Sequence, residues 1–329
     1  MDIFLCTQCG ARLQNAFTEP CACGFVTPIV DGVYQLTKDA PTSAAGNSLQ
    51  WLGYDGVGEN YEPAYFHDKD NDVIGNCDNL ADFLGKGKVA LDIGAGLGVS
   101  SIAMAQSGLQ VVAADISQVM LAAGWERAQK HDAKSIVFAR MNGYKLPLAS
   151  HSVDAVLEVD MLRQVDRPDI VISEIKRVLK PGGYLLQYGP GQSLGYTDAQ
   201  AADNAKYNAA LNDICAYYDD LLQAAGYQGA LFSSWEQSEK CVKENFILVK
   251  TIENTGAYMS NNRRWLLKWG LHKLKTRASG AKQLIPDALH NTAWEQTHAY
   301  ATAKYGKNYE DIPRWSNSAG SMVALAQIY

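Results

Sequence analysis

The sequence predicts an α/β protein in which a doubly wound parallel sheet is joined to a small cysteine-rich segment and a helical C-terminal extension. Two observations predict the sheet. Short apolar runs alternate with helix-length segments between residues 88 and 190, and a glycine-rich turn follows the first run. Strands that alternate with helices of about 10–15 residues form parallel sheets. The expected units are a cysteine-rich segment at 1–38, a linker and aromatic lid at 39–80, the sheet core at 81–252 and the extension at 253–329.

The elements of the core follow in order along the chain. The expected strands are 89–92, 110–115, 136–140, 153–158 and 184–188, and the expected helices are 99–107, 117–131 and 168–179. Gly108 suits the position after the first helix, Ser117 can cap the second and Pro168 opens the third. We also expect a helix at 203–225 and two closing strands at 229–235 and 245–251. The core is therefore expected to end near Ile252.

Composition limits the class of protein. The chain has 329 residues, a net charge of −6, 47% hydrophobic residues and 19% charged residues, which excludes disorder over most of its length. No stretch approaches the roughly 20 consecutive apolar residues that cross a bilayer, and the N-terminus does not resemble a signal peptide. We therefore expect a cytoplasmic protein. The acidic balance argues against bulk nucleic-acid binding, which needs clustered Lys and Arg.

Four of the seven cysteines lie within the first 23 residues: Cys6, Cys9, Cys21 and Cys23. Their pattern is C-x2-C, a gap of 11 residues, and C-x-C. In a reducing compartment such a group indicates metal binding rather than disulfides, and four thiolates suit a structural Zn²⁺ ion. The alternatives are four buried thiols, or a ribbon that has lost its metal. In either case the segment serves structure or docking, because four thiolates leave no open position for catalysis.

The glycine loop after the first strand reads Asp92-x-Gly94-x-Gly96-x-Gly98. A dinucleotide fingerprint would carry its last glycine where Val99 stands, so the loop suits a ligand whose charged end is an amino acid. Asp92 can accept from an ammonium group, directly or through water. Asp115, at the end of the next strand, can accept from both ribose hydroxyls, and Asn142, after the third strand, can bond the adenine amine. A ligand that combines an amino-acid end, a ribose and an adenine is S-adenosylmethionine. The alternative is that the glycines only allow tight packing and that Asp115 caps a helix.

The runs VALDIGAGLGVSSIAMA, VVAADIS, MNGYKLPLASHSVDAVLEVDMLRQVDRP and EIKRVLKPGGYLL resemble the class I S-adenosylmethionine-dependent methyltransferases. The resemblance covers about residues 80–190 and implies a Rossmann-like methyltransferase sheet. It implies that the glycine loop lines the methionine end of the cofactor and that Asp115 holds the ribose. It further implies that Ile116 lies beside the adenine and that Glu158 faces the junction of cofactor and substrate. Asn142 stands where the family more often has Asp.

The segments outside the core are candidates for binding the acceptor, the molecule that would receive the methyl group. Residues 51–80 are rich in aromatic side chains, and the resemblance implies a lid from which Tyr61 or Tyr65 reaches the sulfonium; the alternative is a helix packed on the sheet. Residues 253–329 carry 10 Lys and Arg against 5 Asp and Glu, and four of the seven Trp. The basic run 263–277 is open to three interpretations: a surface for an acidic substrate or a membrane, an RNA-touching patch, or a solvated helix packed on the core or on a second copy of the chain.

These features predict a biosynthetic enzyme that transfers a methyl group to a small, natural-product-like acceptor at O, N or C. The alternatives are an rRNA guanine methyltransferase, a class that also joins a cysteine ribbon to this core, and a non-catalytic cofactor-binding partner protein. The sequence assigns no catalytic residue: His67, His151 and Asp160 are candidates for a base, and methyl transfer needs alignment above all. The sequence also leaves open whether the chain forms a homo-oligomer through the C-terminal extension.

Overall fold

The computed structural model describes residues 1–14, 19–37, 75–189, 192–193, 195–227, 235–253, 255, 260–277, 282 and 285–328. Within these residues the main sheet has nine strands in the order β1-β2-β5-β4-β3-β6-β7-β12-β9. The parallel part runs from β2 to β7, and β12 is antiparallel to both of its neighbours. This order confirms the predicted doubly wound α/β fold.

The core alternates strand and helix as expected. Its strands are β3 (Val89–Ile93), β4 (Gln110–Asp115), β5 (Ile136–Arg140), β6 (Val153–Glu158) and β7 (Leu179–Tyr188). Its helices are α2 (Asp78–Leu84), α3 (Val99–Gln106), α4 (Gln118–Lys130), α5 (Pro168–Val178) and α7 (Trp235–Asn245), with a short 3-10 turn η2 (Leu162–Gln164). The Ser117 hydroxyl accepts from Met120 N, 3.2 Å away, which confirms the predicted cap of α4.

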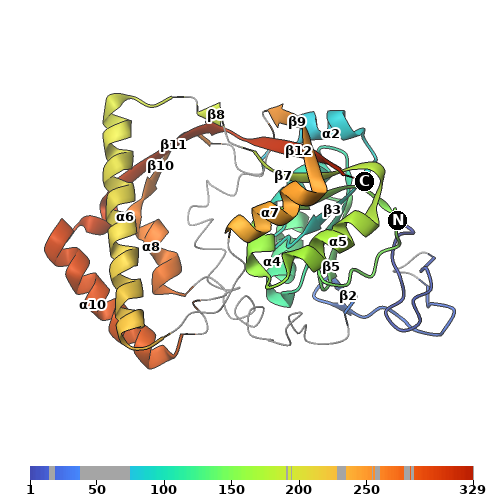
Figure 1. The fold of residues 1–329 in the computed structure, drawn as a ribbon, viewed down its shortest axis with the longest axis horizontal. Coiled ribbons are helices and arrows are strands. Elements are labelled where there is room, and N and C mark those ends of the chain that lie inside the picture. Colours follow the sequence, from blue (N-terminus) through green and yellow to red (C-terminus); the bar gives the residue numbers. More distant parts are fainter. Residues whose placement is uncertain are drawn as a thin grey trace.

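Helices cover both faces of the sheet (Figure 1). Residues that alternate along each strand point to opposite faces. Leu91 and Val112 pack in the hydrophobic cluster that includes α5, and Ala90 and Val111 pack in the cluster that includes α2, α3 and α4. All four side chains are fully buried. The near-continuous apolar strands are therefore explained by a sheet that is buried on both faces.

The expected end of the core at Ile252 is wrong. Strand β9 (Phe246–Glu253) ends there, but the last strand of the sheet is β12 (Ser321–Gln327), which lies between β7 and β9. Met322 and Ala324 are fully buried within one of the two core clusters. Residues 254–320 are thus an insertion between two sheet strands rather than a terminal extension. The run SMVALAQ has the apolar content of a buried strand, but its distance in the sequence from β7 and β9 hid its pairing partners.

The insertion and the segment after β7 form a separate lobe, seen to the left of the sheet in Figure 1. The lobe contains α6 (Asp198–Ala224), α8 (Leu267–Lys275), α10 (Asp287–Tyr305) and the 3-10 turn η3 (Tyr309–Asp311). It also contains the small antiparallel sheet of β10 (Ser260–Leu266), β11 (Pro313–Ala319) and β8 (Gln192–Ser193). A hydrophobic cluster of its own, which includes Tyr218, Leu271 and Tyr309, holds the lobe together.

The N-terminal segment joins the main sheet. Strands β1 (Ile29–Val30) and β2 (Val33–Gln35) form a hairpin, with Asp31 and Gly32 both at positive φ in its turn. Strand β2 then pairs in parallel with β5, so the segment is anchored on the edge of the core instead of forming an independent ribbon.

Two expectations fall outside the described residues. The linker and the aromatic lid, with Tyr61 and Tyr65, lie almost wholly within 38–74, and the expected strand at 229–235 lies almost wholly within 228–234. Among the described residues, none of the helices combines the length and the apolar character that spanning a bilayer requires.

Candidate functional site

The glycine loop between β3 and α3 lies at the carboxyl edge of the parallel strands, where α/β sheets bind their ligands. Gly94, Gly96 and Gly98 all have positive φ, at 77°, 52° and 68°. A Cβ atom on Gly94 would stand 2.6 Å from side-chain atoms of Met161, and one on Gly98 would stand 2.8 Å from the Phe138 ring. Backbone conformation and close packing both require glycine at these positions, so the loop lies tightly against the neighbouring strands.

Asp115 stands at the end of β4, directly beside this loop. Its Oδ2 accepts from Gly96 N at 2.8 Å, and its Oδ1 accepts from Ser117 N at 2.9 Å. The carboxylate therefore fixes both the glycine loop and the start of α4. Both earlier interpretations of Asp115, as a structural residue and as a ribose ligand, are compatible with this arrangement.

Asp92 lies beneath the glycine loop and is only 3% exposed. Its Oδ2 accepts from the Ser101 hydroxyl at 2.6 Å. Burial, together with the nearby carboxylates of Asp115 and Glu158, raises the pKa of Asp92 to about 7. The burial favours an indirect action on a bound ammonium group, through charge or water, over direct contact.

Glu158 ends β6 and is 4% exposed. Its Oε1 accepts from Leu162 N at 2.9 Å, and its Oε2 accepts from Gln187 Nε2 at 2.7 Å. Burial raises the pKa of this carboxyl group. Glu158 thus organises the turn after β6 and joins it to β7.

Ile116 and Asn142 lie at the same edge of the sheet as Asp115. Met141 N donates to the Asp115 carbonyl at 2.9 Å, and Arg140 Nε donates to the Ile116 carbonyl at 3.0 Å. The Asn142 side chain accepts from Tyr144 N at 2.9 Å, which makes a local turn. The structure therefore brings all eight sequence-predicted cofactor residues to one edge: Asp92, Gly94, Gly96, Gly98, Asp115, Ile116, Asn142 and Glu158.

Sequence reasoning missed several residues that shape this edge. Met161 follows Asp160, which has a positive φ of 60°, and its side chain lies over both Gly94 and Gly143. The Tyr144 hydroxyl donates to the Asp166 carboxylate and so joins the turn after β5 to the segment after β6. These contacts join residues that are distant in the sequence, so the spacing of residues along the chain does not reveal them. The positive φ of Asp160 likewise depends on the fold and is not indicated by the neighbouring sequence.

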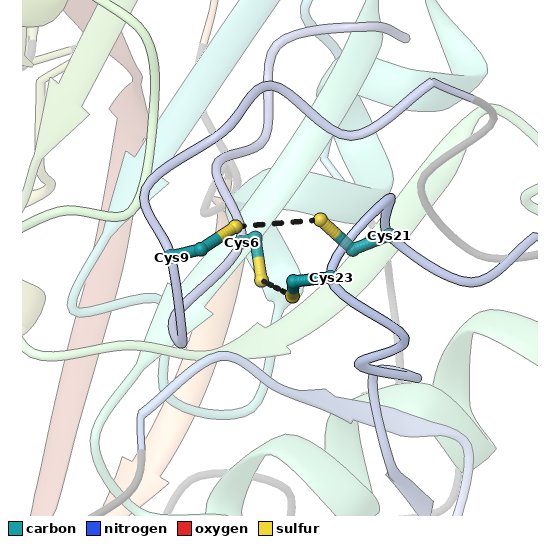
Figure 2. A group of neighbouring side chains, drawn as sticks. All are labelled: Cys6, Cys9, Cys21 and Cys23. Carbon is teal, nitrogen blue, oxygen red and sulfur yellow. Dashed lines mark hydrogen bonds between the residues drawn. The ribbon is translucent and has the colours of Figure 1, made fainter.

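The four N-terminal cysteines converge in space (Figure 2). Their sulfur atoms all lie within 4.8 Å of one another. Cys6 Sγ is 3.7 Å from Cys23 Sγ, and Cys9 Sγ is 3.6 Å from Cys21 Sγ. Sulfurs at about 2.3 Å from a tetrahedral Zn²⁺ ion stand about 3.8 Å apart, so the cluster fits a zinc ion. Gly10 and Gly24, each at positive φ after a cysteine, form the two turns.

Comparison with known proteins agrees with this geometry. The family described as a methyltransferase domain matches residues 91–187, which contain the glycine loop, Asp115, Asn142 and Glu158. Residues 91–187 are therefore similar to a methyltransferase domain, in agreement with the resemblance of the sequence motifs. The methyltransferase domain thus covers β3 to β7, and the cysteine cluster and the lobe lie outside it.

Curated relatives match the same domain. The demethylmenaquinone methyltransferase of Clavibacter sepedonicus is 42% identical over 100 residues, which are 30% of this chain and 40% of the relative. That of Corynebacterium glutamicum strain R is 41% identical over 99 residues, again 30% of this chain and 40% of the relative. The chain therefore spans about two fifths of the length of the curated relatives it matches.

Solved structures with a similar arrangement include the [4+2]-cyclase SpnF, which has a TM-score of 0.45 and is 18% identical. That match covers 88% of this chain and 97% of the other. Phosphoethanolamine N-methyltransferase 2 of Haemonchus contortus, in complex with S-adenosyl-L-methionine, has a TM-score of 0.41 and is 20% identical. This match covers 84% of this chain and 57% of the other protein.

Proposed function

We propose that the chain transfers the methyl group of S-adenosylmethionine to a small-molecule acceptor. The observation that carries this proposal is the junction of Asp115 with the glycine loop at the carboxyl edge of the methyltransferase domain. There the Asp115 carboxylate accepts from Gly96 N, which places a carboxylate acceptor for ribose hydroxyls directly beside the glycine loop. Gly94 to Gly98 and the buried Asp92 would hold the methionine end of the cofactor, and Ile116 and Asn142 would hold its adenine.

When bound, S-adenosylmethionine supplies a methyl group on a positively charged sulfur, which leaves as a neutral thioether when the acceptor attacks. The chain's own part is to align the two reactants, since a reacting atom held about 3–3.5 Å from the methyl carbon gains most of the available rate. Glu158 is held by Gln187 and Leu162 N, so it serves to fix the turn after β6 rather than to remove a proton.

The lobe is the proposed site of the acceptor. Three of the chain segments that connect it to the sheet leave from Tyr188 in β7, Glu253 in β9 and Ser321 in β12. Ser321 is paired with Glu253, and Gly189 N, next to Tyr188, donates to the Ser321 carbonyl at 2.9 Å. All three points therefore lie at the same edge of the sheet as the glycine loop. A lobe that grows from this edge would hold an acceptor on the side of the sheet where the glycine loop would hold the cofactor.

We propose a ring-shaped, quinone-like acceptor, because the relatives that match this domain at 36–42% identity are demethylmenaquinone methyltransferases. The partly buried Trp265, Trp269 and Trp315 give the lobe the aromatic surface that such a ring needs. In this reaction a ring carbon of the reduced quinone bonds to the methyl group and then releases its proton, which restores the aromatic ring.

The test is a methyl-transfer assay with a methyl-labelled cofactor. Purified chain, S-adenosylmethionine and a panel of reduced naphthoquinones are incubated, and the products are analysed by mass spectrometry. We expect a labelled ring product and one S-adenosylhomocysteine per transfer. Calorimetric titration with S-adenosylhomocysteine accompanies the assay. Cofactor binding without transfer to any quinol contradicts the acceptor class, whereas no binding contradicts the function itself.

Cofactor affinity is expected to depend on pH through Asp92. The raised pKa of about 7 leaves Asp92 largely neutral at pH 6 and ionised at pH 8. A ligand with an ammonium group favours the ionised form, so affinity should increase about tenfold between pH 6 and pH 8. Titrations of wild-type chain and of Asp92→Asn give the measurement, and the variant corrects for titration of the ligand itself. Equal pH slopes in the two proteins contradict the assignment.

We also propose that the cysteine cluster holds one structural zinc ion. Elemental analysis of reduced, untagged protein is expected to find about one zinc per chain. Cys9→Ser should lose the metal, because three thiolates hold zinc less tightly than four. Cys241→Ser is the matched control, since Cys241 lies on α7, away from the cluster. Metal-free protein with four titratable N-terminal thiols contradicts the proposal.

A further inference from the structure

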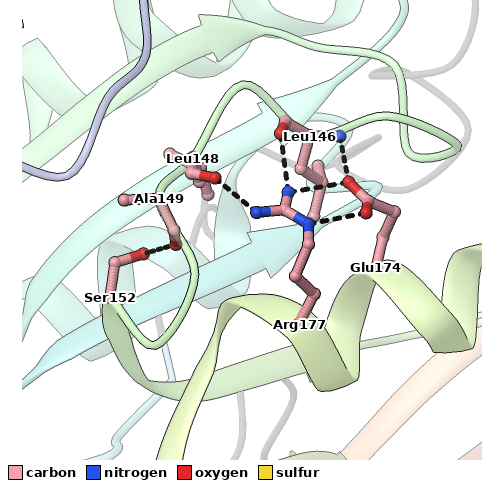
Figure 3. Close-up of polar contacts among 6 residues, drawn as sticks. All are labelled: Leu146, Leu148, Ala149, Ser152, Glu174 and Arg177. Atoms are coloured by element: carbon pink, nitrogen blue, oxygen red, sulfur yellow. Dashed lines mark hydrogen bonds and ion pairs between the residues drawn. The ribbon is translucent and has the colours of Figure 1, made fainter. Parts of the chain in front are cut away.

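Residues 142–149 lie in the connection between β5 and β6 and begin with Asn142, the proposed adenine contact. Arg177 of α5 holds this segment from one side (Figure 3). Its Nη1 donates to the Leu148 carbonyl at 2.7 Å, and its Nη2 donates to the Leu146 carbonyl at 2.9 Å. One guanidinium group thus fixes two carbonyls of the segment.

Glu174, one turn earlier on α5, completes this contact. Its Oε1 accepts from Arg177 Nε at 2.7 Å, and its Oε2 accepts from Arg177 Nη2 at 2.8 Å. The same Oε2 accepts from Leu146 N at 2.7 Å. The Glu174 side chain is 17% exposed and that of Arg177 is 31% exposed. A two-pronged pair that is largely shielded from water is geometrically specific, and Lys cannot replace Arg in it.

The cysteine segment holds residues 142–149 from the other side. Leu5 N donates to the Pro147 carbonyl at 2.8 Å, and Ala149 N donates to the Ile3 carbonyl at 2.8 Å. Between them, Phe4 is fully buried and pairs with Leu148 as an isolated antiparallel bridge. Cys6 follows at once in the chain. The short ladder at 3–5 therefore continues directly into the four-cysteine cluster.

The other end of the segment belongs to the cofactor edge. Asn142 and Tyr144 form the local turn, and the Tyr144 hydroxyl reaches Asp166 beyond β6. Leu146, held by Glu174 and Arg177, is two residues further on. The position of Asn142 is thus linked to α5 and to the cysteine segment through fewer than ten residues of chain.

We propose that Glu174 and Arg177 on one side and residues 3–5 on the other are positioning elements for the adenine end of the cofactor, and that metal at the cysteine cluster raises cofactor affinity through them. This inference rests on the proposed function. It assigns the cysteine segment a role in S-adenosylmethionine binding, although none of its residues reaches the glycine loop in the described structure. Metal loss loosens the ladder at 3–5, and residues 142–149 then lose one of their two supports.

The experiment measures the Kd of S-adenosylhomocysteine by calorimetry for zinc-loaded wild-type chain, Arg177→Ala, Arg177→Lys and Cys9→Ser. We expect Kd to rise at least fivefold in Arg177→Ala and Cys9→Ser. Arg177→Lys should recover only part of the loss, because an ammonium group cannot hold both carbonyls and Glu174 together. Lys134→Ala, which removes an exposed pair with Asp132, is the control and should leave Kd unchanged.

Hydrogen exchange separates positioning from general destabilisation. In Cys9→Ser and Arg177→Ala we expect faster exchange at residues 142–149 with unchanged exchange in β3 and β4. An unchanged Kd in both variants, or faster exchange throughout the sheet, overturns the proposal. Wild-type chain that fails to bind S-adenosylhomocysteine overturns the proposed function instead, so the two failures are distinguishable.

Discussion

Removal of residues 321–329 is expected to abolish the folded sheet and all cofactor binding, although every proposed cofactor residue lies upstream. Strand β12 separates β7 from β9, so its loss leaves two strands with unpaired edges. It also removes the buried side chains of Met322, Ala324 and Leu325. Each large apolar side chain contributes about 1.5–3 kcal/mol, and the lost ladder bonds add to this. The total is comparable with the roughly 5–15 kcal/mol that stabilises a typical domain.

Circular dichroism with thermal unfolding, and titration with S-adenosylhomocysteine, measure this result. The matched control ends the chain after Gln327, which keeps β12 and removes the exposed Ile328. The control should unfold cooperatively near the wild-type temperature. A chain cut after Gly320 that still unfolds cooperatively and binds the cofactor shows that β12 is dispensable, against this prediction.

Asp115→Ala should weaken S-adenosylhomocysteine binding by more than about 100-fold. Two charge-assisted hydrogen bonds to ribose are lost, each worth about 1.5–3 kcal/mol, and each 1.4 kcal/mol is a factor of ten in affinity. Gly96 N and Ser117 N lose their acceptor as well, so the glycine loop becomes less ordered. Asp115→Asn should fall between wild type and Ala, because the amide keeps one acceptor oxygen.

Calorimetric titration gives the affinities, and Glu126→Ala is the control because Glu126 is exposed on α4. Thermal unfolding of the same samples distinguishes a lost ligand bond from a disordered core. If Asp115→Ala binds as tightly as wild type, the carboxylate is only a structural element of the loop and the ribose assignment fails.

The core was predictable because its signals are local. The glycines at 94, 96 and 98 stand at positions that demand positive φ, and Asp115 ends a strand that its own apolar run defines. The spacing of the four cysteines likewise predicted a cluster that the fold brings together. In each case a short stretch of sequence contains both the residue and the reason for its position.

The rest depended on contacts between distant residues. Nothing near residues 321–327 indicates that this strand lies between β7 and β9. The hydrogen bond from Gln187 to Glu158 and the clasp between Tyr144 and Asp166 join elements whose proximity only the sheet order determines. The same is true of Arg177, whose sequence context suggests an exposed helical charge but whose guanidinium holds two loop carbonyls.

The insertion of the lobe between β9 and β12 also governs the order in which the molecule can fold. On a ribosome, the strand that completes the sheet emerges only after the entire lobe has been synthesised. Closing a long flexible loop costs entropy, but Thr255 N already donates to the Gly320 carbonyl at 3.0 Å, so a collapsed lobe holds its two ends together. The lobe then acts as a large preformed hairpin turn that delivers β12 beside β9. Defects in the hydrophobic cluster of the lobe should therefore slow maturation of the methyltransferase sheet, even where they leave its equilibrium stability unchanged.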